Sequence, residues 1–321
     1  MSRPIYADPV HDGAADPTVI HRYGTAEWWM FYTNRRADLD GEGFGWIHGS
    51  AIGVAVSSDG GRSWAYRGTV AGLDAPEDAG GLNTHWAPEV IRARGAYHMF
   101  LTYMPGASDS PEHADRRIEH FESPDLVTWT RRGPLPRKTR NVIDAAVALC
   151  PDGLYRLWYK DEADGSSTHA LASPDLARWH DEGMVLAGAP DAPPHEGPNV
   201  FFLSGFWWLI VDEWCGQAVY RSNDARAWRR QGLILEEPGH DPDDRRFARH
   251  ADVVTQGDWA ALFYFTHPDW AETETPVPVS FAERRTVIHV ARLSVANGQL
   301  RAERNIDGVT LDPALAGLTH R

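Results

Sequence analysis

The chain alternates short apolar, aromatic runs with polar segments rich in glycine, proline and aspartate. Five such runs have the length and the aromatic content of buried β-strands. They are residues 27–33, 96–102, 154–159, 205–211 and 259–265. No segment keeps a helical period between caps, because glycine and proline interrupt the pattern too often. The pattern therefore predicts an all-β protein.

A second pattern, Ser-x-Asp followed by tryptophan, recurs after four of these runs. It occurs at residues 57–64, 122–129, 172–179 and 221–228, and a degenerate turn near Asn297-Gly298 follows the fifth run. The four tryptophans lie 65, 50 and 49 residues apart. Five units of about fifty residues, each with four strands, predict a five-bladed β-propeller with four antiparallel strands per blade. We expect residues 1–321 to form a single domain, with residues near 1–14 and 300–321 completing or clasping the last blade.

Composition narrows the class of protein. The 321 residues are 42% hydrophobic and 24% charged, which is enough to bury a large core. The formal charge of −14 would repel a nucleic acid. Fourteen tryptophans, ten tyrosines and eleven phenylalanines supply flat apolar faces of the kind that bind sugars.

Cys150 and Cys215 lie in apolar runs without metal-ligand spacing, so we expect core thiols. No apolar segment at the N-terminus or elsewhere resembles a signal peptide or a membrane span, and we expect a cytoplasmic protein with no membrane partner.

Ionisable residues recur where the first strand of each blade begins. Aligning the five opening strands places Asp16, Ala87, Asp144, Glu196 and His250 in one shared position. Glu89 lies two residues beyond this position in blade two, on the same strand face. Because first strands line the central channel of a propeller, these side chains should form a ring of carboxylates at one end of the channel. Like charges at such a range shift one another's pKa and are costly without a function.

The second strand of each blade runs back, so its end should emerge on the same face of the disc. These ends carry the charged or polar residues Arg35, Lys160, Asp161, Glu213 and His267, which we expect to line the same pocket as Asp16. The Ser-x-Asp turns should lie on the opposite face, where serine and aspartate satisfy the turn backbone and tryptophan packs between blades. For the turns we favour this structural role over a functional one.

At these residues the sequence resembles glycoside hydrolase family 43, whose members are five-bladed propellers that remove arabinofuranosyl or xylosyl units with inversion. Residues 15–20 resemble the general-base motif of that family, residues 142–144 the motif of its second aspartate, and residues 195–198 its general-acid motif. Residues 86–89 resemble its blade-two motif. Ala145 and Glu89 depart from the family pattern, which commonly has proline and aspartate there. Family 117, which acts on anhydro-galactose units, is a second candidate relative.

The resemblance implies catalytic roles for Asp16 as base, Glu196 as acid, and Asp144 as the charge that keeps the pKa of Glu196 raised. It also suggests that His250 helps to hold a structural calcium or a water cluster in the channel, although calcium prefers oxygen ligands. No cofactor is required. Together the residues predict an exo-acting, inverting glycoside hydrolase acting on an arabinofuranosyl, xylosyl or galactose-type unit.

Substrate binding is assigned to side chains around the expected channel mouth: Trp86, His85, His48, Arg35, Glu89, Lys160, Asp161, Glu213, His250 and His267. The long loops 37–49, 72–86, 236–249 and 267–286 should wall this mouth into a pocket. Three alternatives stay open. A sialidase shares the Ser-x-Asp turn, a glycoside phosphorylase could use Arg35, Arg36 and Lys160 to hold phosphate, and a glycan-binding propeller would bind without cleaving. The sequence does not indicate an oligomeric state.

Overall fold

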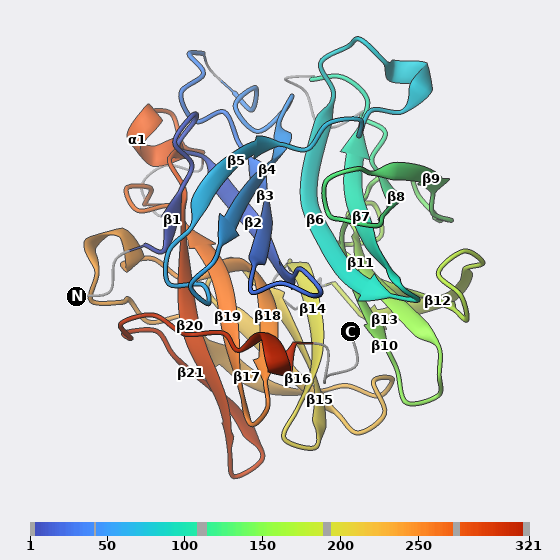
Figure 1. Ribbon diagram of the computed structural model, residues 1–321, viewed down its shortest axis with the longest axis vertical. Coiled ribbons are helices and arrows are strands. Elements are labelled where there is room, and N and C mark those ends of the chain that lie inside the picture. Colours follow the sequence, from blue (N-terminus) through green and yellow to red (C-terminus); the bar gives the residue numbers. More distant parts are fainter. Residues whose placement is uncertain (1–3, 42, 108–113, 189–193, 272–276, 317–321) are drawn as a thin grey trace.

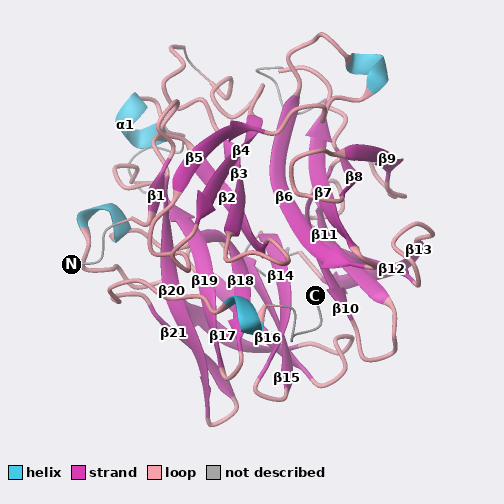
Figure 2. Cartoon of the chain, in the orientation of Figure 1, coloured by secondary structure: helices cyan, strands magenta, loops and turns pink. Residues whose placement is uncertain are grey.

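The computed structural model describes residues 4–41, 43–107, 114–188, 194–271 and 277–316. Their strands form five antiparallel sheets, which confirms the predicted five-bladed β-propeller (Figure 1). Strands dominate the described chain, and the helical segments are short (Figure 2). These are α1 (Phe281–Arg284) and the 3-10 turns η1 (Pro76–Asp78), η3 (Pro242–Asp244) and η4 (Pro313–Leu315). No helix in the described ranges is both long and apolar enough to span a membrane.

The first four blades each contain four strands that are hydrogen-bonded in chain order. Blade one comprises β2 (Ala14–His21), β3 (Trp28–Asn34), β4 (Ala51–Ser57) and β5 (Ala65–Thr69). Blade two comprises β6 (Thr84–Ala93), β7 (Ala96–Met104), β8 (Arg117–Ser123) and β9 (Thr130–Pro134). Blade three comprises β10 (Val142–Leu149), β11 (Tyr155–Asp161), β12 (Ser167–Ser173) and β13 (His180–Leu186). Blade four comprises β14 (Glu196–Leu203), β15 (Phe206–Asp212), β16 (Gln217–Ser222) and β17 (Arg229–Ile234).

Blade five contains segments from both ends of the chain. It comprises β18 (Arg249–Gln256), β19 (Trp259–Thr266) and β20 (Val287–Ala296), and two short strands share the outer edge of β20. β21 (Gln299–Glu303) pairs with one part of β20, and β1 (Tyr6–Ala7) pairs with another, with Tyr6 opposite Ile288. The N-terminal strand therefore closes the ring, as expected, by tying the chain that enters blade one to blade five.

The Ser-x-Asp turns connect the third and fourth strands and have the structural role inferred for them. Ser57 donates its hydroxyl to Asp59 Oδ1 at 2.8 Å, and Asp59 Oδ1 in turn accepts the backbone N–H of Ser63 at 2.9 Å. The tryptophan at each turn packs edge-on against an aromatic ring in the second strand of the preceding blade. The pairs are Trp64–Phe263, Trp129–Phe31, Trp179–Phe100 and Trp228–Trp158. Each such pair contributes about 0.5–1.5 kcal/mol beyond the area it buries, so the repeated turn also joins the blades.

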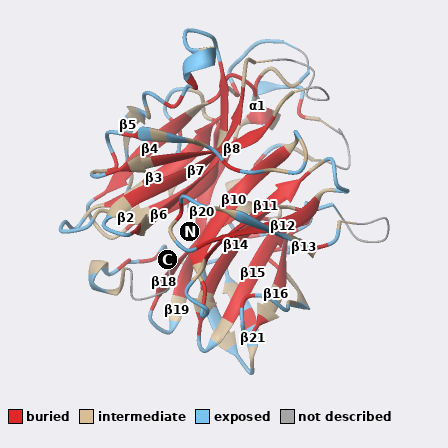
Figure 3. Ribbon diagram, turned by 90° about the vertical axis from the view of Figure 1, so that its right-hand side faces the viewer, coloured by how far each residue is buried: buried red, intermediate tan, exposed pale blue. Residues whose placement is uncertain are grey.

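The core lies between neighbouring sheets, and the exposed residues gather mostly in the loops (Figure 3). One apolar cluster, for example, combines Met30 and Tyr32 of blade one with Phe263 and Ile288 of blade five. Cys150 is buried as expected, but Cys215 is exposed, so the expectation of two core thiols is wrong for Cys215. The sequence around Cys215 belongs to a tight turn after β15 rather than to the strand itself.

The innermost strands form the wall of the central channel, and polar side chains connect them across it. Glu89 on β6 accepts the backbone N–H of Val147 on β10 at 3.1 Å. Asp252 on β18 accepts the backbone N–H of Val19 on β2 at 2.8 Å and the side-chain amide of Asn199 on β14 at 3.0 Å. These carboxylates therefore bind neighbouring blades together, which is why the channel tolerates buried charge.

Candidate active site

A cavity of about 580 Å³ opens where the first strands begin and the second strands end. Its lining includes all three predicted catalytic carboxylates, Asp16, Asp144 and Glu196. The other lining residues are aromatic, basic or supplied by the long loops: Arg35, Phe44, Trp46, Ile47, His48, Trp86, Arg116, Ile143, Glu162, Trp214, Arg249, His250, His267, Trp270, Val277 and Pro278. A volume of this size is typical of a small-molecule site.

A β-bulge at the start of each first strand directs side chains into this cavity. The ladder is interrupted between Ala15 and Thr18 in blade one and between Ile143 and Ala146 in blade three. At the bulge Asp16 has φ 48° and Asp144 has φ 59°, a left-handed conformation that is unfavourable for a residue with a side chain. Such strain costs on the order of 1–3 kcal/mol and recurs at functional sites. The bulge therefore turns both carboxylates out of the regular strand alternation.

Glu196 does not occupy the same strand position as Asp16, which corrects the sequence alignment. Glu196 pairs with Asp212 across the ladder, just as Ala15 pairs with Thr33, so Glu196 lies one residue before the bulge residue. The bulge residue of blade four is Gly197, with φ 56°. A Cβ atom at Gly197 would lie 2.6 Å from the His250 ring, so the absence of a side chain there lets His250 reach the cavity.

Asp16 is held by two basic side chains. Arg35 donates from Nη2 to both carboxylate oxygens, at 3.2 and 3.3 Å. The His250 Nδ1 atom lies 3.8 Å from Asp16 Oδ1 and 4.0 Å from Asp144 Oδ2. Burial opposes protonation of His250, but Asp144 and Asp16 outweigh it and raise the pKa of this imidazole. His250 therefore lies between the two carboxylates of blades one and three as a shared counter-charge.

Asp144 is fixed at both its backbone and its carboxylate. Its N–H donates to Thr102 Oγ1 at 2.9 Å, and its Oδ2 accepts the N–H of Gly197 at 3.0 Å. Burial, with Glu196 and Asp16 nearby, raises the pKa of Asp144 to about 6, although His250 acts in the opposite direction. Asp144 is therefore a carboxyl group that changes protonation state near mildly acidic pH.

The pKa of Glu196 is lowered, whereas the sequence analysis expected it to be raised. Burial would raise its pKa, but Lys160 Nζ lies 3.2 Å from Oε2, and together with a hydrogen bond from Trp214 it lowers the pKa of Glu196 to about 2. The lysine side chain is only 3% exposed, so its charge is poorly screened by water. The expectation that Asp144 keeps the pKa of Glu196 raised is therefore wrong for the protein without substrate.

The predicted substrate-binding residues divide into two groups. Arg35, His48, Trp86, His250 and His267 line the cavity. The rings of His48 and Trp86 stack with their centroids 5.3 Å apart, and the Trp86 Nε1 donates to the carbonyl of Ile47 at 2.7 Å. This pair forms a fixed aromatic platform at the blade-two side of the mouth. Lys160 contributes indirectly, through its ion pair with Glu196.

The other predicted residues do not line the cavity, and each has a structural role instead. His85 packs against Tyr103 and its Nδ1 lies 3.2 Å from the carbonyl oxygen of Ser50. Asp161 is fully buried and accepts the Thr139 hydroxyl at 2.7 Å. Glu213 forms an ion pair with Arg230 at 2.6 Å. Glu89 lies deeper in the channel, as described above. The expectation that Asp161 and Glu213 share the pocket of Asp16 is therefore wrong, because their side chains are bound to Thr139 and Arg230 instead.

Several cavity residues were not assigned from the sequence. Arg249 pairs with Phe265 in the β18–β19 ladder, just before the bulge of blade five. Glu196 occupies the equivalent position in blade four. Trp46, Trp214 and Trp270 come from loops, whose conformation cannot be predicted from the period-two pattern of strands. Asp212 lies behind the cavity, fully buried, and accepts the backbone N–H of His250 at 3.1 Å. Burial raises the pKa of Asp212 to about 7. If the opening strands are aligned by their bulges instead of by their carboxylates, Arg249 falls at the position of Glu196.

The donor set does not support the suggested calcium. In the part of the chain that the structure describes, no three or more His, Cys, Asp or Glu side chains are grouped as metal ligands. The carboxylate oxygens of Glu89 and Asp252, on the innermost strands, already accept hydrogen bonds from neighbouring blades. His250 offers nitrogen, whereas calcium prefers oxygen.

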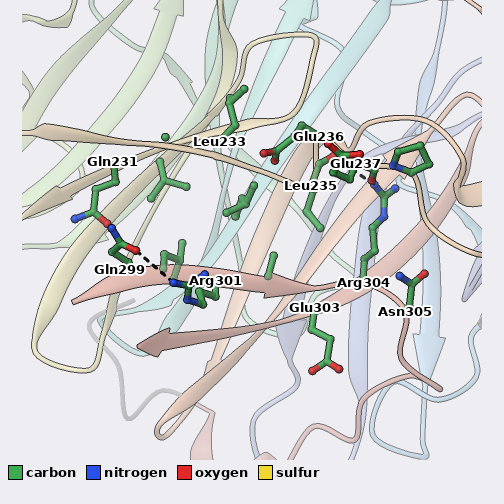
Figure 4. Close-up of a pocket in the computed structure, with 16 residues that line it drawn as sticks. Gln231, Leu233, Leu235, Glu236, Glu237, Gln299, Arg301, Glu303, Arg304 and Asn305 are labelled. Atoms are coloured by element: carbon green, nitrogen blue, oxygen red, sulfur yellow. Dashed lines mark hydrogen bonds between the residues drawn. The ribbon is translucent and has the colours of Figure 1, made fainter. Parts of the chain in front are cut away.

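A second cavity, of about 590 Å³, lies far out on the blades. β17 and β21 line it, together with the segments that follow them, and Figure 4 shows its polar side chains, among them Gln231, Glu236 and Arg301. Arg304 at its edge is bound to the buried carboxylate of Asp244. None of the three predicted catalytic carboxylates lines this cavity.

The proteins that resemble this chain are found among solved structures. No family model matches the sequence, and no curated protein matches it either. Solved structures do match. A thermostable family-43 glycoside hydrolase is 16% identical, with a TM-score of 0.69 over 96% of this chain and 99% of that one. A GH43 β-xylosidase/α-arabinofuranosidase from a compost microbial metagenome, in complex with xylotriose, is 14% identical, with a TM-score of 0.66 over 96% and 98%.

A third match is the native arabinanase of Bacillus subtilis, which is 16% identical, with a TM-score of 0.64 over 90% of this chain and 99% of that one. At these identities the likeness shows the fold. The chain thus has the five-bladed propeller fold of family 43 glycoside hydrolase structures over nearly its whole length.

Proposed function

We propose that this protein is a glycoside hydrolase in which residues 1–321 form one catalytic domain that removes a terminal sugar from an oligosaccharide with inversion. The observation that carries the proposal is the convergence of Asp16, Asp144 and Glu196 from three blades onto one aromatic cavity. Two carboxyl groups on opposite sides of a glycosidic bond are the minimum that this hydrolysis requires. The likeness in fold to family 43 structures supports the same class of reaction.

In this mechanism Asp16 acts as the general base. Its carboxylate takes a proton from a water molecule, and the water oxygen forms a bond to the anomeric carbon as the bond to the leaving oxygen breaks. Arg35 and His250 fix the orientation of Asp16. Glu196 donates a proton to the leaving oxygen, so that charge balances on both sides of the sugar. Asp144 positions Glu196 through Gly197, whose N–H its carboxylate accepts.

The ion pair with Lys160 places a condition on this role. Glu196 is ionised in the free protein, so it acquires its proton at low pH or when the bound substrate separates it from Lys160. Trp214, which contacts Glu196 and lies 5.4 Å from the Lys160 ammonium, is 40% exposed at the mouth. A leaving group that covers Trp214 would come close to this ion pair.

The walls of the cavity favour exo action on a short oligosaccharide. Trp46, Trp86, Trp214 and Trp270 surround the carboxylates, and loops from blades one and five cover their sides. Sugar rings stack on such faces. Among proteins of this fold, one is a β-xylosidase/α-arabinofuranosidase in complex with xylotriose and another is an arabinanase, so pentosides are the first substrates to test.

Substitution of the two principal carboxylates tests the proposal. Asp16→Asn should lower kcat on every substrate by about 10²–10⁴-fold, because an amide cannot take the proton from the attacking water. Glu196→Gln should keep more activity on an aryl glycoside with an activated leaving group than on a natural oligosaccharide. Asp258→Asn, which changes an exposed turn carboxylate, is the matched control and should leave kcat unchanged.

Proton NMR of the first product identifies the stereochemistry. Inverted anomeric configuration is expected, and retained configuration would refute the assignment of Asp16 as a base. Turnover that depends on inorganic phosphate would indicate a phosphorylase. Binding without cleavage across a panel of plant and algal oligosaccharides would instead indicate a glycan-binding propeller.

A further inference from the structure

Trp214 has the most exposed ring among the four tryptophans of the described chain that line the cavity. It is 40% exposed, whereas Trp46 is buried and Trp86 and Trp270 are half-buried. Protein side chains pack on the rings of the other three: His48 and Arg116 on Trp86, His267 and Arg35 on Trp46, and His267 and Arg249 on Trp270. A sugar ring stacks only on an open aromatic face, so Trp214 is the best placed of the four to bind one.

The backbone at Trp214 has a conformation that tryptophan rarely adopts. Its φ is 56°, in the left-handed region that favours glycine or asparagine. Two hydrogen bonds fix the turn: Trp214 N–H donates to Asp212 Oδ1 at 2.7 Å, and Glu213 N–H donates to the carbonyl of Gly216 at 3.1 Å. Core packing compensates little for this strain, because the ring is exposed. Strain of this kind recurs at functional sites.

The Trp214 side chain also contacts the candidate acid. Its one polar group, the indole N–H, donates a hydrogen bond to the Glu196 carboxylate. The buried Lys160 ammonium lies 5.4 Å from the Trp214 ring centroid and 3.2 Å from Glu196 Oε2. Lys160 therefore lies on the buried side of the ring, and the exposed part faces the cavity. Because Glu196 would protonate the leaving oxygen, the exposed part of the ring lies where the leaving group would extend.

We propose that Trp214 binds the leaving group of the substrate by stacking, and that its indole N–H is the positioning group for Glu196. This inference rests on the proposed glycosidase function. It names the class of leaving group that the cavity accepts, which is one with a flat apolar face, such as the next sugar ring of an oligosaccharide. The residue that binds the leaving group thereby also holds the acid that protonates it.

Removal of the ring tests the binding of the leaving group. Trp214→Gly deletes the side chain and suits a φ of 56°, so the thermal midpoint should equal or exceed that of the wild type. On the preferred oligosaccharide of the panel, kcat/KM should fall about 10–100-fold, as expected for the loss of a central aromatic contact. On the glycosyl fluoride of the same terminal sugar, kcat/KM should change less than about threefold, because a single-atom leaving group neither reaches the ring nor needs an acid.

Trp214→Phe separates stacking from the hydrogen bond. Phenylalanine keeps a flat ring, so KM for the oligosaccharide should stay within about twofold of the wild-type value. The N–H is lost, so the charged form of Glu196 loses a hydrogen bond, and the basic limb of kcat/KM should move to higher pH by about half a unit or more. The other groups that face Glu196 stay in place in this variant: Lys160 on β11, Asp144 on β10, Asp212 on β15, and Arg249 and His250 on β18.

Arg94→Gly is the matched control, since Arg94 is an exposed residue with a φ of 52° in the turn between β6 and β7. It should leave kcat/KM on both substrates and the pH profile unchanged.

A lowered thermal midpoint in Trp214→Gly, together with equal losses on oligosaccharide and fluoride, would show that the ring is structural and would overturn the proposal. A basic limb that does not move in Trp214→Phe would overturn the positioning of Glu196. Cleavage of the fluoride by the wild type alongside either result would leave the proposed hydrolase standing. If no fluoride and no oligosaccharide is cleaved, the hydrolase is contradicted, and the leaving-group site with it.

Discussion

At the scale of single residues, one buried lysine determines the charge of the candidate acid. Lys160 is the penultimate residue of β11 in blade three, yet its ammonium contacts Glu196 of blade four at 3.2 Å. An opposite charge at this range lowers the pKa of a carboxyl group by about 1–3 units. The same residue is 3.9 Å from Glu162, so it balances two carboxylates at once.

Replacement of Lys160 by methionine should therefore change the pH profile. Without the ammonium the pKa of Glu196 rises toward the value that burial favours, so Glu196 keeps its proton to higher pH. The basic limb of kcat/KM should move upward by about one unit or more. Initial rates measured from pH 3 to pH 8 show the limb. Lys138→Met, which alters an exposed lysine paired with Asp181, should leave it in place. A basic limb that stays unchanged in Lys160→Met would mean that Glu196 is not the acid.

At the scale of elements, the paired second and third strands of blade two bury two histidines. His98 on β7 and His120 on β8 contact each other at 3.0 Å, and His120 also stacks on Phe100 at a centroid distance of 4.6 Å. Burial, with His98 and Arg132 nearby, lowers the pKa of His120 to about 3. The pair lies away from the cavity and affects the stability of the blade.

This pair should make the fold sensitive to acid. The unfolded chain binds a proton at His120 near pH 6.5, whereas the folded chain does not until about pH 3. Between these values the unfolded state holds more protons, so stability is full above pH 6.5 and falls as the pH drops. From pH 7 to pH 4 the histidine should cost about 3 kcal/mol of the free energy of unfolding. His120→Phe should lose that part of the pH dependence in urea titrations, while the exposed His180→Phe should keep it. An unchanged dependence in His120→Phe would place the acid sensitivity elsewhere.

At the scale of the whole molecule, closure of the ring depends on a very short strand. β1 contributes two residues, but Tyr6 is buried and its hydroxyl lies 2.8 Å from that of Tyr32 in blade one. Tyr32 in turn donates to Asp8 at 2.5 Å. The first residues that the structure describes thus join blades one and five by side chains as well as by backbone pairing.

Removal of the Tyr6 ring should weaken this closure. Tyr6→Ala should lower the free energy of unfolding by about 3–5 kcal/mol, the usual cost of truncating a buried aromatic side chain. Urea unfolding followed by tryptophan fluorescence measures it. Tyr23→Ala, at a 68% exposed position, should cost far less. Equal losses in the two variants would mean that β1 does not stabilise the ring.

The sequence by itself determined the repeat, the number of blades, the roles of the Ser-x-Asp turns and the convergence of Asp16, Asp144 and Glu196. These features can be predicted because strand period, turn chemistry and repetition depend on residues that are close together in the sequence. Tertiary structure alone decided which neighbours those carboxylates meet. The bulge moved Glu196 one position from Asp16, and Lys160 rather than Asp144 came to control its charge. Arg249, Trp46 and Trp270 also line the cavity. Bulges and loops place them there, and the hydrophobic period of the sequence does not predict the conformation of either. Electrostatic character depends on distances between blades far apart in the chain, and so it appears only once the ring has closed.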